Sequence, residues 1–339
     1  MRIFSSALEG CALKYLNLSN NAMGEKGVRA FEALLRSQNN LEELYLMNNG
    51  ISGEAAEALC ELIPSTEKLK VLHFHNNMTG DEGAIAISEV LKRSPLLEDF
   101  RCSSARVDSD GGIAFSQSLE SCISLRKLDL RDNIFGVQAG IVLSRTLEKL
   151  GGISELYLSY LNLEDKGAIA IFDALNKSVP CLEVLEIAGN EITTKAAPHL
   201  AACLIRKHTL RKLSLSENEM KDEGAVVIGK ALEGSNPQLR ELDFSSNMLR
   251  RAGATCLARA VVTNKPDFVL LNIDGNAISE EGIEEVKEIL RNGKKDETVL
   301  GSLDDNEPEG EEESGEEEDA ENGGGEVAVE AELDKLCFQ

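Results

Sequence analysis

Three polar side chains near the middle of the sequence have types and a spacing that could do chemistry on another protein: Arg106, Asp132 and Asn133. A carboxamide such as that of Asn133 both donates and accepts hydrogen bonds, and Asp132 adds a carboxylate beside it. Arg106 lies in the preceding copy of a repeat, so one strand spacing would bring its guanidinium to the same edge of a sheet. The simplest alternative is a surface arginine near a surface aspartate, a pair worth little energetically.

The repeats can be aligned on the position of Asn133, which we call the slot. Its successive occupants are Asn21, Asn49, Asn77, Ala105, Asn133, Leu161, Asn190, Asn218, Asn247 and Asn276. The steps of 28 or 29 residues are typical of leucine-rich repeats. Only two repeats lack asparagine in this slot, which is broken there by Ala105 and Leu161. These two repeats flank Asn133, so Asn133 has no slot asparagine in either neighbouring repeat.

Each repeat has a strand part and a helix part. The strand part has the form L-x-x-L-x-L-x-x-N, as in LRKLDLRDN at residues 125–133, with apolar residues at alternate positions. Residues 80–93 and 164–177 then carry apolar residues at helical spacing. One unit cannot bury its apolar face alone, so stacked units must share a core. Because strands are spaced at about 4.8 Å and helices at about 10 Å, the stack must curve.

The sequence therefore predicts an α/β leucine-rich repeat solenoid, a horseshoe of about ten repeats with a parallel sheet on its concave face and helices on its convex face. Residues 1–12 are interpreted as the end of a preceding repeat or a truncated N-terminus, and residues 13–295 as the repeat domain. Residues 296–339 are predicted to form an acidic, mostly disordered tail, because they are nearly free of large apolar runs.

Composition narrows the possible partners. The formal net charge is -24, and residues 304–339 contribute sixteen Asp or Glu against one Lys. This charge disfavours nucleic acid and favours a basic protein partner. The eight cysteines are widely spaced and are interpreted as reduced, buried thiols. No apolar run reaches the roughly 20 residues that span a bilayer, so a cytoplasmic protein without membrane insertion is expected.

Other candidate chemistry in the sequence is weak. The repeated asparagines have a structural explanation, since an amide in that slot can pair the polar groups of a buried turn. His73 and His75 would point the same way from one strand, but no third metal ligand is evident, and two solvated histidines are expected. The strand positions that face away from the core show no array of nucleophile, base and acid. The chain is therefore not expected to be an enzyme by itself.

The sequence also resembles a known family. Leucine-rich repeats of 28 residues followed by an acidic tail are similar to the GTPase-activating proteins of the small GTPase Ran. The segments HNNMTGDEGAIAI, SPLLEDFRCSSARV, LDLRDNIFG and ELYLSYLNLEDKGAIAI resemble the plant members in particular. The resemblance covers nearly all of residues 1–323.

This resemblance implies a function and a set of residues. The family's catalytic asparagine lies in a D-N-x-F-G motif, here DNIFG, which assigns that role to Asn133. Its important arginine lies in an R-V pair that Arg106 and Val107 match, and Asp132 would contact the GTPase. The asparagine would orient the catalytic glutamine of GTP-bound Ran, without an arginine finger.

The chain would then need no cofactor of its own, because the partner carries GTP and Mg²⁺. Such a function would support nucleocytoplasmic transport. Plant members also carry an N-terminal domain with a Trp-Pro-Pro motif that directs them to the nuclear envelope, and this chain contains no tryptophan.

Two alternatives remain open from the sequence. One is a non-catalytic leucine-rich repeat binding protein, such as an inhibitor of a basic protein, although ribonuclease inhibitors are richer in cysteine and tryptophan. The other is the sensor half of an immune receptor, which would require a nucleotide-binding module not found here.

Overall fold

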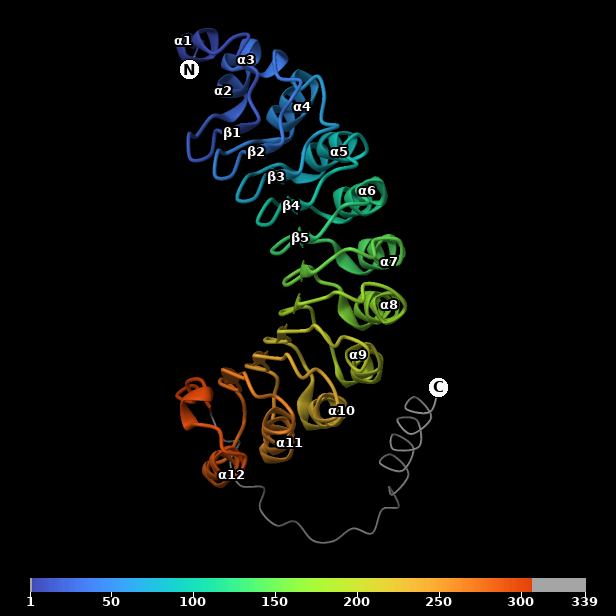
Figure 1. Cartoon of the computed structure of the whole chain (residues 1–339), viewed down its shortest axis with the longest axis vertical. Coiled ribbons are helices and arrows are strands. Elements are labelled where there is room, and N and C mark those ends of the chain that lie inside the picture. Colours follow the sequence, from blue (N-terminus) through green and yellow to red (C-terminus); the bar gives the residue numbers. More distant parts are fainter. Residues whose placement is uncertain (1, 307–339) are drawn as a thin grey trace.

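A computed structural model describes residues 2–306 of the chain (Figure 1). Ten short parallel strands form one sheet in chain order, and helices connect them. The strands are β1 (Tyr15–Asn17), β2 (Glu43–Tyr45), β3 (Val71–His73), β4 (Asp99–Arg101), β5 (Lys127–Asp129), β6 (Glu155–Tyr157), β7 (Val184–Glu186), β8 (Lys212–Ser214), β9 (Glu241–Asp243) and β10 (Leu270–Asn272). This sheet confirms the predicted ten-repeat solenoid.

The α-helices lie on the outer side of the curved sheet (Figure 1). They are α1 (Arg2–Ala7), α2 (Gly24–Ala30), α3 (Glu32–Arg36), α4 (Gly53–Leu62), α5 (Gly80–Leu91), α6 (Ser109–Ser118), α7 (Gly136–Leu147), α8 (Glu164–Lys177), α9 (Ala197–Leu204), α10 (Lys221–Glu233), α11 (Arg251–Val262) and α12 (Glu280–Asn292). Three 3₁₀ turns, Leu119–Ser121, Thr194–Ala196 and Glu297–Val299, complete the described helical structure. Among residues 2–306, no helix has both the length and the apolarity needed to cross a bilayer.

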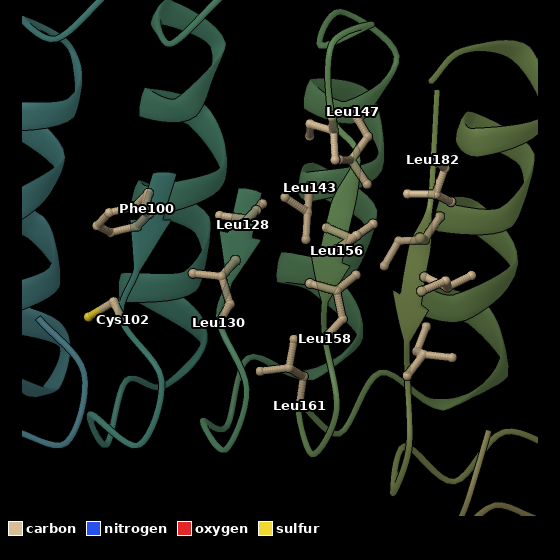
Figure 2. Packing of buried hydrophobic residues seen from close by; sticks show 14 of the residues in the cluster. Phe100, Cys102, Leu128, Leu130, Leu143, Leu147, Leu156, Leu158, Leu161 and Leu182 are labelled. Carbon is tan, nitrogen blue, oxygen red and sulfur yellow. The ribbon is translucent and has the colours of Figure 1, made fainter. Parts of the chain in front are cut away.

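The core between the two layers is a mainly aliphatic ladder that also contains buried phenylalanines. Leu128 pairs with Phe100 on one side and Leu156 on the other, and all three side chains are fully buried. Figure 2 shows these side chains and those of α7 packed in successive layers. Leu161, which replaces the slot asparagine, also points into this core and is fully buried. Alternation along each strand thus produces the core that the sequence predicted.

Four of the seven cysteines of the described part are buried as expected, whereas Cys11 is exposed and Cys181 and Cys256 are partly exposed. Cys60, Cys102, Cys122 and Cys203 are free thiols buried in the core. Burial raises the pKa of each of these four thiols to about 12, so they remain protonated and unreactive at neutral pH. Cys337 lies outside the described residues.

The repeat contacts continue beyond the C-terminal boundary predicted at residue 295. Leu300 forms a bridge with Leu271 of β10, and the Gly301 N–H donates to the Leu271 carbonyl at 2.9 Å. Asn306 Oδ1 accepts from the Asn276 N–H at 3.0 Å, as a further ladder residue would. Residues 296–306 therefore form an ordered half-repeat, because SLDDN places Leu303 and Asn306 at ladder spacing. Residues 307–339 of the predicted acidic tail lie outside the described residues.

A second row of polar side chains, not predicted from the sequence, ties the C-terminal repeats together on the helix side. Each member lies eleven residues before a ladder slot and donates to main-chain carbonyls at or just beyond the C-terminal end of the helix in the preceding repeat. The members are Lys207, Asn236, Lys265 and Lys295. Lys207 and Lys265 are only 2% and 1% exposed. Their buried ammonium groups pair with carbonyls at helix C-termini.

We expect Asn306→Ala to lower the free energy of unfolding by about 1 kcal/mol, because the Asn276 N–H loses its acceptor. Urea unfolding followed by circular dichroism would measure this change. Asn292→Ala, at an exposed asparagine ending α12, is the matched control and should be neutral. Equal stability of both variants would show that residues 296–306 do not contribute to the solenoid.

Candidate functional site

Each ladder asparagine from Asn49 onward joins its own repeat to the one before. Asn218 Nδ2 donates to the carbonyls of Leu215 at 2.9 Å and Ile187 at 3.2 Å. Its Oδ1 accepts from the N–H groups of Asn190 and Ile192, both at 3.1 Å. The amide thus satisfies main-chain groups of a turn that water does not reach.

Asn133 makes the same contacts. Its Nδ2 donates to the carbonyls of Leu130 at 2.8 Å and Cys102 at 2.9 Å. Its Oδ1 accepts from the N–H groups of Ala105 at 3.2 Å and Val107 at 3.0 Å. The side chain is 4% exposed. In the isolated chain this amide therefore does not stand free at the rim, because the slot points into the turn.

The two substituted slots do not release Asn133, because its side chain bonds only to main-chain groups, which any residue in those slots supplies. On one side the Asn133 N–H donates to the Tyr160 carbonyl at 3.2 Å instead of to a slot amide, while Leu161 turns into the core. On the other, the Ala105 N–H still donates to Asn133 Oδ1 at 3.2 Å. The irregularity that singled out Asn133 changes the acceptor of its main-chain N–H, not the burial of its side chain.

Arg106 and Asp132 do reach the rim, and the Asn133 amide holds the loop of Arg106. The two N–H groups that bond to Asn133 Oδ1 belong to the residues on either side of Arg106. The Asp132 N–H donates to the Ser159 carbonyl at 3.0 Å. Both Arg106 and Asp132 have positive φ, of 60° and 55°, and both side chains are exposed. Residues 2–306 supply neither side chain with an ion-pair partner, so Arg106 and Asp132 do not pair with each other.

All three predicted residues line one groove along the rim, with a volume of about 970 Å³. It runs past the slot turns of the first five repeats, and Met78 and Ile134 contribute apolar surface, being 52% and 56% exposed. Sequence reasoning missed these two residues. The sequence could have indicated that both lie at the rim, because each directly follows the slot asparagine of its repeat.

The concave face beside this groove is internally paired. Arg131 forms ion pairs with Asp129 and Glu186, each at 2.9 Å, and its guanidinium carbon lies 4.7 Å from the centre of the Tyr157 ring. Arg101 makes a bidentate hydrogen-bonded pair with Asp99, as Arg131 does with Asp129. These arginines are therefore already engaged, whereas Arg106 has no such partner in the described chain.

The histidine pair differs from expectation. His73 is 8% exposed, its Nε2 lies 3.2 Å from Asp99 Oδ1, and its ring packs edge-on against Tyr45, so it is not solvated. Burial acts to raise the pKa of Asp99, but His73 and Arg101 outweigh it and lower that pKa to about 2. The pKa of His75 is lowered, by burial first and then by His73. No group of three potential metal ligands occurs within residues 2–306.

Comparison with known proteins supports this architecture. A family model described as "Leucine Rich repeat" matches residues 11–31, 37–60 and 206–229. The chain therefore has the fold of a leucine-rich repeat solenoid. It is 61% identical over 312 residues to "RAN GTPase-activating protein 2" of Arabidopsis thaliana, covering 92% of this chain and 56% of that protein.

Two further relatives match shorter parts of the chain. "RAN GTPase-activating protein 1" of Arabidopsis thaliana is 66% identical over 204 residues, covering 60% of this chain and 38% of that protein. The ribonuclease inhibitor of Sus scrofa is 33% identical over 116 residues, covering 34% of this chain and 25% of the inhibitor. The chain spans about half the length or less of the two plant relatives it matches.

We expect Asn133→Ala and Asn218→Ala to lower the free energy of unfolding by similar amounts, about 2–4 kcal/mol, because each leaves several buried main-chain groups unpaired. Urea unfolding of both variants would test this. Gln138→Ala, at an exposed amide on α7, should have little effect. An Asn133→Ala variant as stable as the unaltered chain would show that its amide is not a ladder element.

Proposed function

We propose that the chain is a GTPase-activating protein for the small GTPase Ran in its GTP form, acting in the cytoplasm in support of nucleocytoplasmic transport. The observation that supports this most strongly is the high identity to two proteins named RAN GTPase-activating proteins. In addition, the residues that match the family's motif, Arg106, Asp132 and Asn133, line a single groove.

In this proposal the chain supplies orientation and the GTPase supplies the reacting groups. Hydrolysis by such GTPases is limited by the placement of the attacking water and of a glutamine, and the GTP and Mg²⁺ belong to the GTPase. A stiff repeat scaffold can fix the partner's mobile loop and so reduce the entropic part of the barrier. No cofactor of the activator is needed for this role.

We assign Asn133 a positioning role within this mechanism. Its amide is fully used in holding the turns that carry Arg106 and Asp132, so a direct contact with the partner's glutamine would first have to break one of those bonds. Asn133 therefore acts through the loops that it fixes. Arg106 and Asp132 act as docking groups that meet charges of opposite sign on the GTPase.

The role of Arg106 as a docking residue, with no arginine finger, leads to a kinetic prediction. Arg106→Gln should raise the concentration of GTP-loaded Ran needed for half-maximal rate about tenfold, while leaving the maximal rate close to that of the unaltered chain. Arg106→Lys should recover part of the loss. Multiple-turnover hydrolysis with substoichiometric activator would measure both quantities.

Arg145→Ala, at an exposed arginine on the outer helix α7, is the control and should be silent. A large fall in maximal rate for Arg106→Gln, with unchanged half-saturation, would instead indicate that the guanidinium stabilises charge on the phosphates. If the unaltered chain bound Ran only stoichiometrically and never turned over, the chain would be a non-catalytic binding protein.

A comparison of Asn133→Ala with Asn218→Ala separates disruption of the rim site from general destabilisation of the solenoid. Both should lose stability, but only Asn133→Ala should lose most of the stimulation, because only its turns carry Arg106 and Asp132. Single-turnover hydrolysis at a temperature well below both unfolding transitions would compare them. Equal loss of stimulation in both variants would contradict the assignment.

A further inference from the structure

Tyr160 forms an exposed aromatic platform on the rim, beside the groove. The residue directly precedes the broken slot at Leu161, has a φ of 57° and is 41% exposed. Its hydroxyl donates to Glu217 Oε1 at 2.5 Å, so the ring bridges from its own repeat, across the next one, to a third. This bond fixes an otherwise mobile side chain against the surface of the turns.

Gly189 makes room for the ring. A Cβ at Gly189 would lie 2.3 Å from two ring atoms of Tyr160, closer than any side chain tolerates. Gly189 has a φ of 59°, but Asp132 and Glu217 occupy the same place in their repeats with φ values of 55° and 54°. The backbone conformation is therefore compatible with other residues at this place, and the position of the tyrosine ring is what requires glycine.

The platform is joined directly to the candidate site. The carbonyl of Tyr160 accepts from the Asn133 N–H at 3.2 Å, and the carbonyl of Ser159 accepts from the Asp132 N–H at 3.0 Å. The turn of Asp132 therefore lies next to that of Tyr160. A partner that covers Arg106 and Asp132 would meet the ring on the C-terminal side of the groove.

The chain itself shows what such a ring binds. Arg131 lies over the Tyr157 ring at 4.7 Å, and Asp129 and Glu186 hold the guanidinium there. Tyr160 has the same components, an aromatic ring with Glu217 bonded to it and Asp132 on the adjoining turn, but residues 2–306 place no cation over its ring. The hydrogen bond to Glu217, followed by burial and then by the charges of Glu217, Asp243 and Asp132, raises the pKa of Tyr160 to about 12.

We propose that Tyr160, Glu217 and Asp132 form a cation-binding platform that receives a lysine or arginine side chain of the partner. A cation over an aromatic face is attracted by the ring, and flanking carboxylates add to that attraction. The identity of the partner as GTP-loaded Ran rests on the proposed function, whereas the preference of the platform for a cation does not. The platform sets the orientation of the partner on the rim and takes no part in the chemical step.

The first experiment needs no GTPase. The four tyrosines of the chain are labelled with 3-fluorotyrosine, and the Tyr160 signal is assigned by its absence in Tyr160→Phe. Titration with a tetra-arginine peptide should shift the Tyr160 signal more strongly than that of Tyr15, which is 55% exposed and serves as the internal control. Glu217→Gln should reduce the Tyr160 shift. Equal shifts of Tyr15 and Tyr160, or no shift of either signal, would overturn the platform.

The second experiment displaces the ring without removing it. Gly189→Ala should raise the half-saturating concentration of GTP-loaded Ran about tenfold, with an unchanged maximal rate. Gly275→Ala is the matched control, because Gly275 has the same place in its repeat and a φ of 63° but no ring above it. Half-saturation that is unchanged in Gly189→Ala would overturn the role of the platform in docking.

The two experiments separate the possible failures. If the unaltered chain does not stimulate hydrolysis but the tetra-arginine peptide shifts Tyr160 selectively, the proposed function is wrong and the cation-binding platform is supported. If stimulation occurs but Tyr160 shows no selective shift, the proposed function stands and the platform is overturned.

Discussion

The structure depends on one requirement: in every repeat, the main-chain polar groups of the turn that follows the strand must be paired inside the protein. The slot asparagine meets this requirement with both ends of its amide, bonding to its own repeat and to the one before. Because each amide reaches the preceding repeat, it also fixes the register between neighbours. The same requirement extends to Asn306, which pairs the last slot of the sheet.

This requirement shapes the candidate site. An amide that pairs a buried turn is not available to a partner, so the groups that a partner can meet are those before and after the slot. At the fifth repeat these are Asp132 and Ile134, and the same amide fixes the neighbouring loop on both sides of Arg106. The rim site is thus built from ladder-flanking residues, and Asn133 determines where they stand.

Charge pairing separates the rim from the concave face. On the concave face, Arg101 and Arg131 are held by carboxylates of their own strands, so their charges are largely compensated within the chain. At the rim, Arg106 and Asp132 lack such partners in the described residues, and Tyr160 presents a ring without a cation. A partner with complementary charges would therefore meet unpaired groups of this chain along the turns rather than on the concave face.

The sequence by itself determined the architecture, because the period of 28 or 29 residues, the alternation of leucines and the slot asparagines are local patterns with local physical causes. It also identified Arg106, Asp132 and Asn133 as residues of one edge. The tertiary structure decided which atoms of these residues are exposed for contact with a partner. The hydrogen bonds of the Asn133 amide reach groups 26 to 31 residues away, and their geometry is set only when the repeats stack.

The same reason explains the other differences. The burial of His73 depends on the neighbouring strands, and the ordered half-repeat ending at Asn306 depends on the open edge of β10. The platform at Tyr160 requires Gly189 and Glu217, which lie in the next two repeats. Periodicity predicts that repeats stack, whereas contacts between unlike residues of different repeats follow only from the packed structure.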